Sequence, residues 1–322
     1  METLLRIGTR GSRLAFVQAE WVAARLRDAH PTLEIRLETF RTVGDRDRAT
    51  PLAHLPGVGF FVKELETALL DDRIDLAVHS MKDVPTRLPE GLGVESAVPV
   101  REDPRECLVT PTGAALADLP EGATVGSSSP RRRAMLLAAR PDLKFIDLRG
   151  NVETRLAKLA AGVCHATVLA AAGLSRLGLL DRRMVKHPIA VLTPPAGQGA
   201  LGLEFRADDD PVRRAIAPLD SPPTRLAVLM ERALVRRLGA GCRTPLGVIG
   251  TVDAAGRFAL EAYLLSPDGR TVLRQSAGGP ACSSPEEARQ VGTLLAESLL
   301  AKGAAGLIGA DPGAYANGAD DA

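Results

Sequence analysis

The sequence contains few of the residues from which several kinds of site are built. Aromatic residues make up 3% of the 322 residues, which leaves few platforms for stacking nucleic-acid bases. The four cysteines form no CxxC pair and the five histidines show no metal-ligand spacing, so neither a disulfide framework nor a zinc site is predicted. No signal-peptide core opens the sequence, and no run approaches the roughly 20 apolar residues of a membrane span. We therefore expect a cytoplasmic protein with reduced thiols, no metal and no membrane partner.

Neither sign of charge is in excess. The formal net charge is +1, from 40 Lys and Arg against 39 Asp and Glu, so no overall field would draw the protein to nucleic acid. Hydrophobic residues make up 45% of the chain and charged residues 25%, which is typical of a soluble globular enzyme. Two or three domains are expected at this length, because a single hydrophobic core usually stops growing at about 250–300 residues.

The order of strand and helix patterns predicts two α/β domains followed by a smaller α+β domain. In the last third, adjacent strand patterns joined by turns are typical of an antiparallel sheet with helices on one face. The stretch 192–206 passes through Pro and Gly into another strand, which would return the chain to the first domain. The predicted domains are residues 1–99 with about 198–218, residues 100–197, and residues 219–310, with a flexible tail at 311–322.

Arginines and hydroxyl residues are concentrated at three predicted strand-to-helix junctions. A helix N-terminus presents unpaired N–H groups and the positive end of the helix dipole, so hydroxyl and guanidinium donors there add to an anion site. Any one junction could instead be a capped helix with a solvated basic turn. Three of them at the carboxyl ends of strands predict a polyanionic ligand between the two α/β domains. The candidates are Arg10 and Ser12, then Ser128, Ser129, Arg131 and Arg132, then Arg149 and Arg155.

The loop MKDVP follows a buried strand pattern and places one carboxylate among cations. Lys82 adds a partner for an anion, whereas Asp83 has the opposite charge. Two interpretations of Asp83 are open. It is either one half of a structural ion pair or a functional group, acting as a general acid or as the counter-charge of a cationic intermediate.

Cys242 lies in the segment LGAGCRTP, between a predicted helix and the first strand of the third domain. Glycines free the backbone there, and Arg243 favours a thiolate. Cys242 is therefore either an inert buried cysteine or a nucleophile. Cys107, Cys164 and Cys282 lie in plain strand or loop patterns and are expected to be inert.

Seven segments, in this order, resemble the porphobilinogen deaminase family: GTRGSRLA, FVKELE, AVHSMKDVP, VGSSSPRR, LRGNVETRL, GQGALGLE and GCRTPLG. The resemblance implies an α/β protein with two periplasmic-binding-protein-like doubly wound domains and a smaller C-terminal domain with a three-stranded antiparallel sheet. It also implies a monomeric transferase of tetrapyrrole biosynthesis. Such an enzyme joins four porphobilinogen molecules head to tail on a covalent dipyrromethane cofactor, releases four molecules of ammonia, and hydrolytically frees hydroxymethylbilane.

The resemblance also implies roles for individual residues. Cys242 would carry the cofactor through a thioether, and Asp83 would stabilise the azafulvenium cation formed when ammonia leaves. Each pyrrole carries an acetate and a propionate, so the growing chain is a polyanion that suits paired arginines. Carboxylate binding is expected of Arg10, Ser12, Lys82, Ser128, Ser129, Arg131, Arg132, Arg149, Arg155 and Arg176. Further cleft residues are expected to be Gln18, Phe61, Ser80, Gln198 and Arg232.

Three positions depart from the family pattern, and two other functions compete with it. His54 and Val58 stand where many relatives carry lysine, which would weaken substrate contacts, and Pro130 replaces a more usual leucine. A bilobal solute-binding protein would bind an anion without catalysis, but it leaves Cys242 and the third domain unexplained. A nucleic-acid-binding role rests on the three arginines at 131–133 alone.

Overall fold

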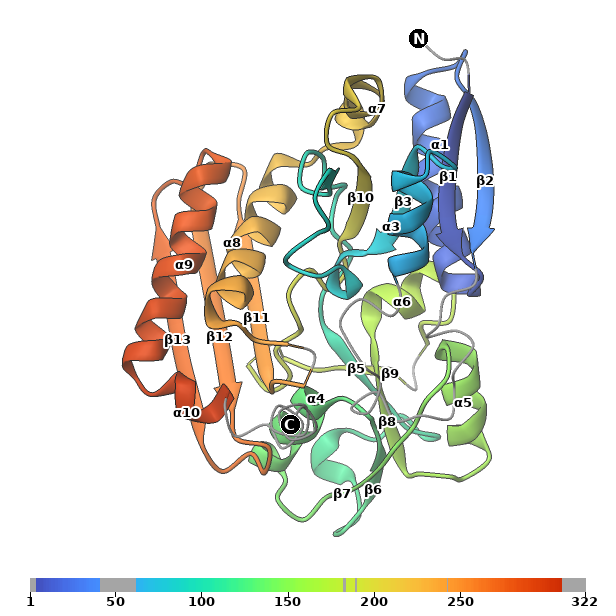
Figure 1. The fold of residues 1–322 in the computed structure, drawn as a ribbon. Helices are drawn as coiled ribbons and strands as arrows, with labels where there is room; N and C mark the ends of the chain where they lie inside the picture. Colours follow the sequence, from blue (N-terminus) through green and yellow to red (C-terminus); the bar gives the residue numbers. More distant parts are fainter. Residues whose placement is uncertain (1–3, 41–61, 182–183, 189, 242, 309–322) are drawn as a thin grey trace, which may run out of the picture.

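The structure is a computed structural model that describes residues 4–40, 62–181, 184–188, 190–241 and 243–308. Its strands form three sheets, two with five strands and one with three (Figure 1). Helices accompany each sheet, and the three-stranded sheet lies at the C-terminal end of the chain. The predicted fold class, α/β with a C-terminal three-stranded antiparallel sheet, is therefore confirmed.

The first sheet takes strands from two distant parts of the chain. Its elements are β1 (Leu4–Arg10), α1 (Arg13–Ala29), β2 (Glu34–Phe40), α3 (Lys63–Leu70), β3 (Leu76–Ser80), the 3₁₀ turn η2 (Met81–Asp83), β4 (Leu92–Gly93), β10 (Leu201–Arg206), α7 (Asp210–Ile216) and the 3₁₀ turn η4 (Ala217–Leu219). The strand order is β2-β1-β3-β10-β4, with β1 parallel to β2 and β3 and with β10 antiparallel to β3 and β4. Helix α1 begins after Ser12, whose hydroxyl accepts a hydrogen bond from the N–H of Ala15. Its apolar face, including Val22 and Leu26, is buried in the core of this sheet.

The second sheet is built from one continuous stretch of chain. Its elements are β5 (Glu106–Val109), the 3₁₀ turn η3 (Leu116–Asp118), β6 (Thr124–Gly126), α4 (Pro130–Ala139), β7 (Lys144–Ile146), α5 (Val152–Ala160), β8 (Ala166–Ala170), α6 (Ala171–Arg176) and β9 (Met184–Lys186). The strand order is β7-β6-β8-β5-β9, and β5 is antiparallel to both of its neighbours. Ser129 caps α4, with Pro130 in the first turn, and Asn151 caps α5. The proline that departs from the family pattern thus occupies a position that a helix start tolerates.

The third sheet is antiparallel and covered on one face by helices. Its elements are α8 (Pro222–Leu238), β11 (Leu246–Val252), β12 (Phe258–Leu265), β13 (Val272–Gly279), α9 (Pro285–Ala301) and α10 (Ala304–Ile308), with strand order β11-β12-β13. Figure 1 shows α8 and α9 side by side over this sheet. They approach closely at Gly292, where an added Cβ would lie 2.1 Å from the carbonyl oxygen of Met230. One buried cluster of leucine, valine, methionine and alanine side chains joins both helices to the strands.

Both crossings between the first and second sheets are fixed to helix α8. The buried carboxylate of Glu231 accepts hydrogen bonds from Arg101 Nη1 at 2.6 Å, from the backbone N–H of Gly197 at 2.6 Å, and from the backbone N–H of Gly250 at 2.7 Å. Arg101 belongs to the first crossing and Gly197 to the second. The two crossings also approach each other closely at Gly199, where a Cβ would lie 2.3 Å from the carbonyl oxygen of Glu102. The backbone of Gly199 has a φ of +86°, which favours glycine. The crossings therefore meet at one charged, enclosed junction.

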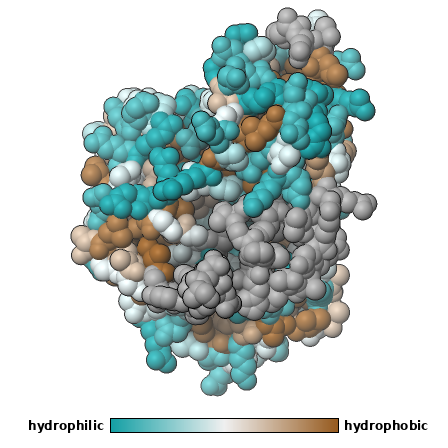
Figure 2. Space-filling model, viewed as in Figure 1, coloured by the Kyte–Doolittle hydropathy of each residue, from teal (hydrophilic) through white to brown (hydrophobic). Residues whose placement is uncertain are grey.

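The surface shown in Figure 2 is mostly hydrophilic, with small hydrophobic patches between the polar side chains. None of the helices in the described part of the chain combines the length and the apolar run that crossing a bilayer requires. Within the same residues, His, Cys, Asp and Glu form no group of three that is suited to holding a metal ion. Cys107, Cys164 and Cys282 are buried free thiols.

Candidate active site

The loop that carries Asp83 is held from several sides. Strand β3 ends at Ser80, whose hydroxyl is 3.0 Å from Gln18 Nε2 of helix α1. Lys82 Nζ donates to Gln198 Oε1 at 3.2 Å, and Gln198 Nε2 donates to the carbonyl of Pro104 at 2.8 Å. Gln18 and Gln198 therefore hold Ser80 and Lys82, the residues three and one before Asp83, which is itself half-buried in η2.

Two of the predicted carboxylate-binding arginines already have an internal carboxylate. Arg132 donates to both oxygens of Glu106, at 3.0 Å and 2.7 Å, and Arg131 donates to the same carboxylate and to the carbonyl of Thr193. Glu106 is fully buried on β5. Burial raises its pKa, but the charges of Arg132 and Arg131 more than compensate and hold it well below its usual range. Glu106 thus fixes both guanidinium groups before any ligand arrives.

Other predicted residues present donors that nothing in the described chain satisfies. The hydroxyl of Ser128 and Nη1 of Arg149 are buried, and among the described residues neither has a hydrogen-bond partner. Arg155 uses its Nε for the carbonyl of Gly150, at 2.9 Å, which leaves its two Nη groups without a hydrogen bond to described residues. Buried donors without partners are rare because each costs about 1–3 kcal/mol. An anionic group with several carboxylates, such as dipyrromethane, fits this set of donors.

Electrostatic coupling connects the two sides of the site. Burial lowers the pKa of Lys82, the neighbouring Asp83 opposes that shift, and Arg132 adds to it. Burial also lowers the pKa of Arg155 to about 10, with Arg132 and Arg149 adding to the shift and Asp83 opposing it. Asp83 of the first sheet therefore lies within the field of the second-sheet arginines. The excess of cations over carboxylates here favours a polyanion.

Arg10 and Ser12 of the first junction, and Arg176, lie in different surroundings from the arginines around Glu106. Arg10 ends β1 and is half-buried, and Ser12 accepts the capping hydrogen bond of α1. Arg176 lies at the end of α6, where its Nη2 donates to the carbonyl of Gly199 at 2.7 Å. Burial lowers the pKa of Arg176, and Glu102 opposes that shift. Arg176 thus contacts the second crossing between the sheets.

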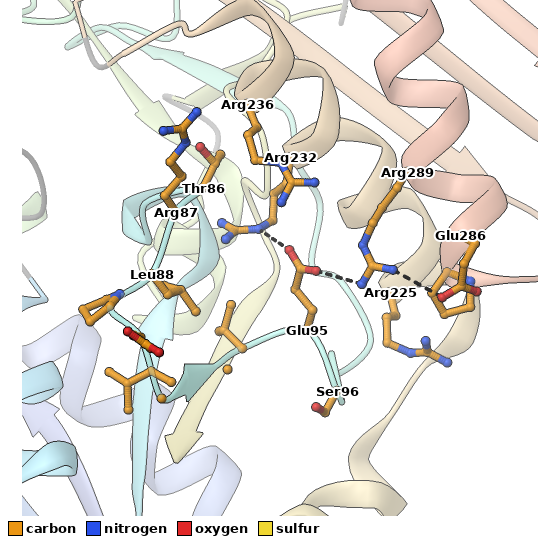
Figure 3. A pocket seen from close by; sticks show the side chains of 17 residues that line it. Thr86, Arg87, Leu88, Glu95, Ser96, Arg225, Arg232, Arg236, Glu286 and Arg289 are labelled. Atoms are coloured by element: carbon orange, nitrogen blue, oxygen red, sulfur yellow. Dashed lines mark hydrogen bonds and ion pairs between the residues drawn. The ribbon is translucent and has the colours of Figure 1, made fainter. Parts of the chain in front are cut away.

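Arg232 lies behind the Asp83 loop and lines a pocket of about 790 Å³ between the segment 86–96 and helices α8 and α9. Its Nη1 and Nη2 donate to the carbonyls of Val84 at 3.0 Å and Pro85 at 2.8 Å. Its Nε donates to Glu95 at 3.1 Å, and Figure 3 shows Glu95 between Arg232 and Arg289. Arg232 therefore supports the chain immediately after Asp83, and its donors are directed at protein atoms.

Two predicted site residues, Cys242 and Phe61, lie outside the described residues, as do His54 and Val58. The flanks of position 242 are described. Thr244 donates its N–H to the carbonyl of Gly241 at 3.0 Å, and its hydroxyl accepts from the N–H of Gly241 at 3.2 Å. This turn follows the left-handed C-cap Gly239 of α8.

Glu106 and Glu231 were not among the residues predicted from the sequence. Glu106 opens the short run ECLV, and a charge at the start of an otherwise apolar strand was the available signal. Glu231 lies within an amphipathic helix pattern in which acidic residues are ordinary, so no local signal marked it.

Two family models match the chain. Residues 5–214 match the description "Porphobilinogen deaminase, dipyromethane cofactor binding domain", and residues 225–301 match "Porphobilinogen deaminase, C-terminal domain". The chain belongs to the porphobilinogen deaminase family. Its cofactor is accordingly dipyrromethane, and its first two sheets lie within the cofactor-binding match.

Curated relatives agree over almost the whole length. The chain is 48% identical over 306 residues to a porphobilinogen deaminase from Syntrophotalea carbinolica, covering 95% of each chain. It is 49% identical over 302 residues to one from Desulforudis audaxviator, covering 94% of this chain and 96% of the other. Among solved structures, the Escherichia coli aliphatic sulphonate binding protein SsuA is 17% identical with a TM-score of 0.40, over 73% of this chain and 70% of that one. The BenM effector binding domain with benzoate is 17% identical with a TM-score of 0.41, over 66% and 88%.

Proposed function

We propose that this chain joins four porphobilinogen molecules head to tail with loss of ammonia and releases hydroxymethylbilane by hydrolysis. The observation that carries the proposal is that the carboxylate of Asp83 lies within the field of a cluster of arginines whose donors are partly unsatisfied among the described residues. When bound, dipyrromethane supplies the pyrrole carbon to which the next unit is joined. A solute-binding protein would need the arginines but would have no use for Asp83.

The arginines divide into two groups. Arg149, Arg155 and Ser128 have donors free to bind acetate and propionate groups, and each charge-assisted bond is worth about 1.5–3 kcal/mol. Arg131 and Arg132 are fixed by Glu106 and form the wall against which such carboxylates lie. Lys82, Arg10, Ser12, Ser129 and Arg176 remain proposed contacts, with Gln18, Ser80, Gln198, Phe61 and Arg232 around them.

Asp83 is proposed to carry the chemistry. Ammonia departs from the aminomethyl carbon of porphobilinogen, so positive charge develops on that pyrrole, and the ionised carboxylate stabilises it. Asp83 donates a proton to the amino group as it leaves, and it accepts the α-hydrogen of the attacking pyrrole as a proton when the carbon–carbon bond forms. Because Asp83 is protonated again at the end of each round, the same group serves every addition.

Several finer points belong to the proposal. The domains are residues 1–99 with about 198–218, residues 100–197 and residues 219–310, followed by the tail 311–322. The protein is a cytoplasmic monomer whose partner is its substrate, and neither nucleic acid nor a membrane takes part. Cys242 carries the cofactor through a thioether.

Intact mass tests the anchor. Purified wild type should be heavier than its sequence by two linked pyrroles, and Cys242→Ser should have the bare sequence mass. If Cys242→Ser also carries the cofactor, the anchor is another cysteine. If wild type shows the bare mass and still consumes porphobilinogen, the covalent attachment is wrong.

Single-turnover ammonia release tests Asp83, in protein whose cofactor has been verified by mass. Asp83→Asn should lose about 10²–10⁴-fold, because a positioned proton-transfer group contributes that much. Arg149→Leu should instead change the distribution of enzyme-bound intermediates, while Arg257→Leu, an exposed arginine paired with Asp253, should change neither. Ammonia release by Asp83→Asn within a few-fold of wild type would reduce Asp83 to a structural ion-pair partner.

A further inference from the structure

Three ionisable side chains are enclosed beneath the Asp83 loop. Glu66 of α3, His79 of β3 and Glu204 of β10 are 7%, 5% and 0% exposed. His79 Nε2 lies 2.9 Å from Glu204 Oε2. In the register of the two strands His79 pairs with Gly202 and Glu204 with Ala77, so His79 and Glu204 are diagonal neighbours on one face of the sheet.

The surrounding charges do not balance this cluster. Among the groups that the structure describes, the charges acting on Glu66 are those of Glu204, His79 and Lys63, and Lys63 is exposed. On the strands packed against α3, Arg6 and Arg206 both bond Asp75, and Arg10 is half-buried at the far end of β1. Arg232 interacts with Glu204 over distance but is bonded to Glu95.

Two enclosed carboxylates therefore face one imidazole. Among the described residues, neither oxygen of Glu204 nor Nε2 of His79 has a hydrogen-bond partner, although Nε2 and Oε2 lie 2.9 Å apart. Glu66, which is 7% exposed and lies in the field of a second carboxylate, is accommodated as the neutral acid. Burial, followed by the charge of Glu204, raises the pKa of Glu66 to about 7, although His79 and Lys63 oppose that shift. The cluster thus loses a proton near neutral pH.

The cluster lies where the Asp83 loop leaves strand β3 of the first sheet. His79 directly precedes Ser80, which bonds Gln18, and the N–H of Met81 donates to the carbonyl of Ala200 at 3.0 Å. The close approach of His79 and Glu204 therefore lies on the two paired strands that lead to Asp83 and to Gln198. A second negative charge on Glu66 would repel Glu204 and weaken that contact.

We propose that Glu66, His79 and Glu204 are positioning residues of the Asp83 loop, and that turnover falls when the cluster loses the proton on Glu66. The proposal rests on the proposed function of Asp83. It adds that the rate of turnover at Asp83 depends on the protonation of a group that does not touch substrate. Of the three residues, Glu66 can be tested with the least disturbance, because glutamine has nearly the shape of the neutral acid.

The first measurement is the thermal midpoint of the holoenzyme between about pH 5 and pH 8, without porphobilinogen. The folded-state pKa of Glu66 lies above the unfolded value of about 4.3, so its stabilising contribution is complete below that value and is lost as pH rises through about 7. The midpoint of Glu66→Gln should fall less than that of wild type over this range. Glu20→Gln, the same change at an exposed position of α1, should follow wild type.

The second measurement is the pH dependence of kcat for ammonia release. About one wild-type molecule in ten keeps the proton one unit above the pKa, so kcat should fall up to about tenfold from pH 6 to pH 8, and that of Glu66→Gln by less than about twofold. KM should change little in either protein, because the carboxylate-binding arginines are untouched. Parallel wild-type and Glu66→Gln profiles would overturn the positioning role even if the thermal midpoints differ. The thermal measurement uses no substrate, so it remains interpretable if Asp83→Asn turns out to be active.

Discussion

Replacing Glu231 by glutamine tests whether the crossings between the first two sheets are anchored on helix α8. The carboxylate is 0% exposed and accepts from Arg101 and from the N–H groups of Gly197 and Gly250, all within 2.7 Å. A glutamine keeps one oxygen, and its NH₂ group would face donors, so Arg101 loses its counter-charge and at least one N–H loses its acceptor. Removing one partner of a buried ion pair costs about 3–5 kcal/mol, which is a large part of a typical stability of about 5–15 kcal/mol.

The assay is equilibrium unfolding in urea. Glu231→Gln should lower the urea midpoint strongly while the slope of the transition stays unchanged. The matched control is Glu297→Gln, whose partner Arg237 is exposed and whose loss should cost at most about 1 kcal/mol. A loss for Glu231→Gln no larger than for the control would show that the Arg101 charge is solvated by other means, and would refute the anchoring role.

Two further predictions concern a glycine and a surface carboxylate. Gly199→Ala should lower the thermal midpoint more than Gly162→Ala. Both glycines have a positive φ, but only the Cβ at 199 would meet the backbone, 2.3 Å from the carbonyl oxygen of Glu102. Equal losses in the two variants would contradict this explanation. Hydrogen bonding from Arg105 holds the pKa of Asp103 well below its usual range. The stability that the ionised Asp103 contributes is therefore complete above its pKa in the unfolded chain, about 3.9, and is lost as the pH falls towards its pKa in the folded protein. Asp103→Asn should therefore have a lower thermal midpoint than wild type at pH 7, and the difference should shrink at about pH 2; a constant difference would exclude the charge as its cause.

The sequence predicted well whatever depends on neighbouring residues. The strand-to-helix junctions at Ser12 and Ser129 were predicted because the end of a strand pattern, a hydroxyl residue and the start of a helix pattern lie within a few residues of each other. The short strands β4, β5 and β9 were not predicted. They have two to four residues each, too few for a periodicity, and they exist because of partners far along the chain.

In the site, too, the features that depend on neighbouring residues were predicted and those that depend on distant contacts were not. Residue types and their order located the arginine-rich junctions, where Arg149 and Ser128 each have a donor without a hydrogen-bond partner in the described part of the chain. It did not follow from spacing that Glu106, far upstream of Arg131 and Arg132, would bind both guanidinium groups. Nor could the sequence place Arg232 behind the Asp83 loop, because that depends on how α8 packs against the first sheet.

The position of β10 in the first sheet has a consequence for synthesis on the ribosome. All strands of the second sheet lie between residues 106 and 186, whereas the first sheet needs Leu201–Arg206 to pair with β3. A chain emerging from its N-terminus can therefore complete the second sheet before the first. Until β10 arrives, β3 is an unpaired edge with exposed backbone donors and acceptors, of the kind that associates with other chains. Slow translation between residues 186 and 206 would lengthen that exposure, so the yield of folded protein should depend on the codons of this segment.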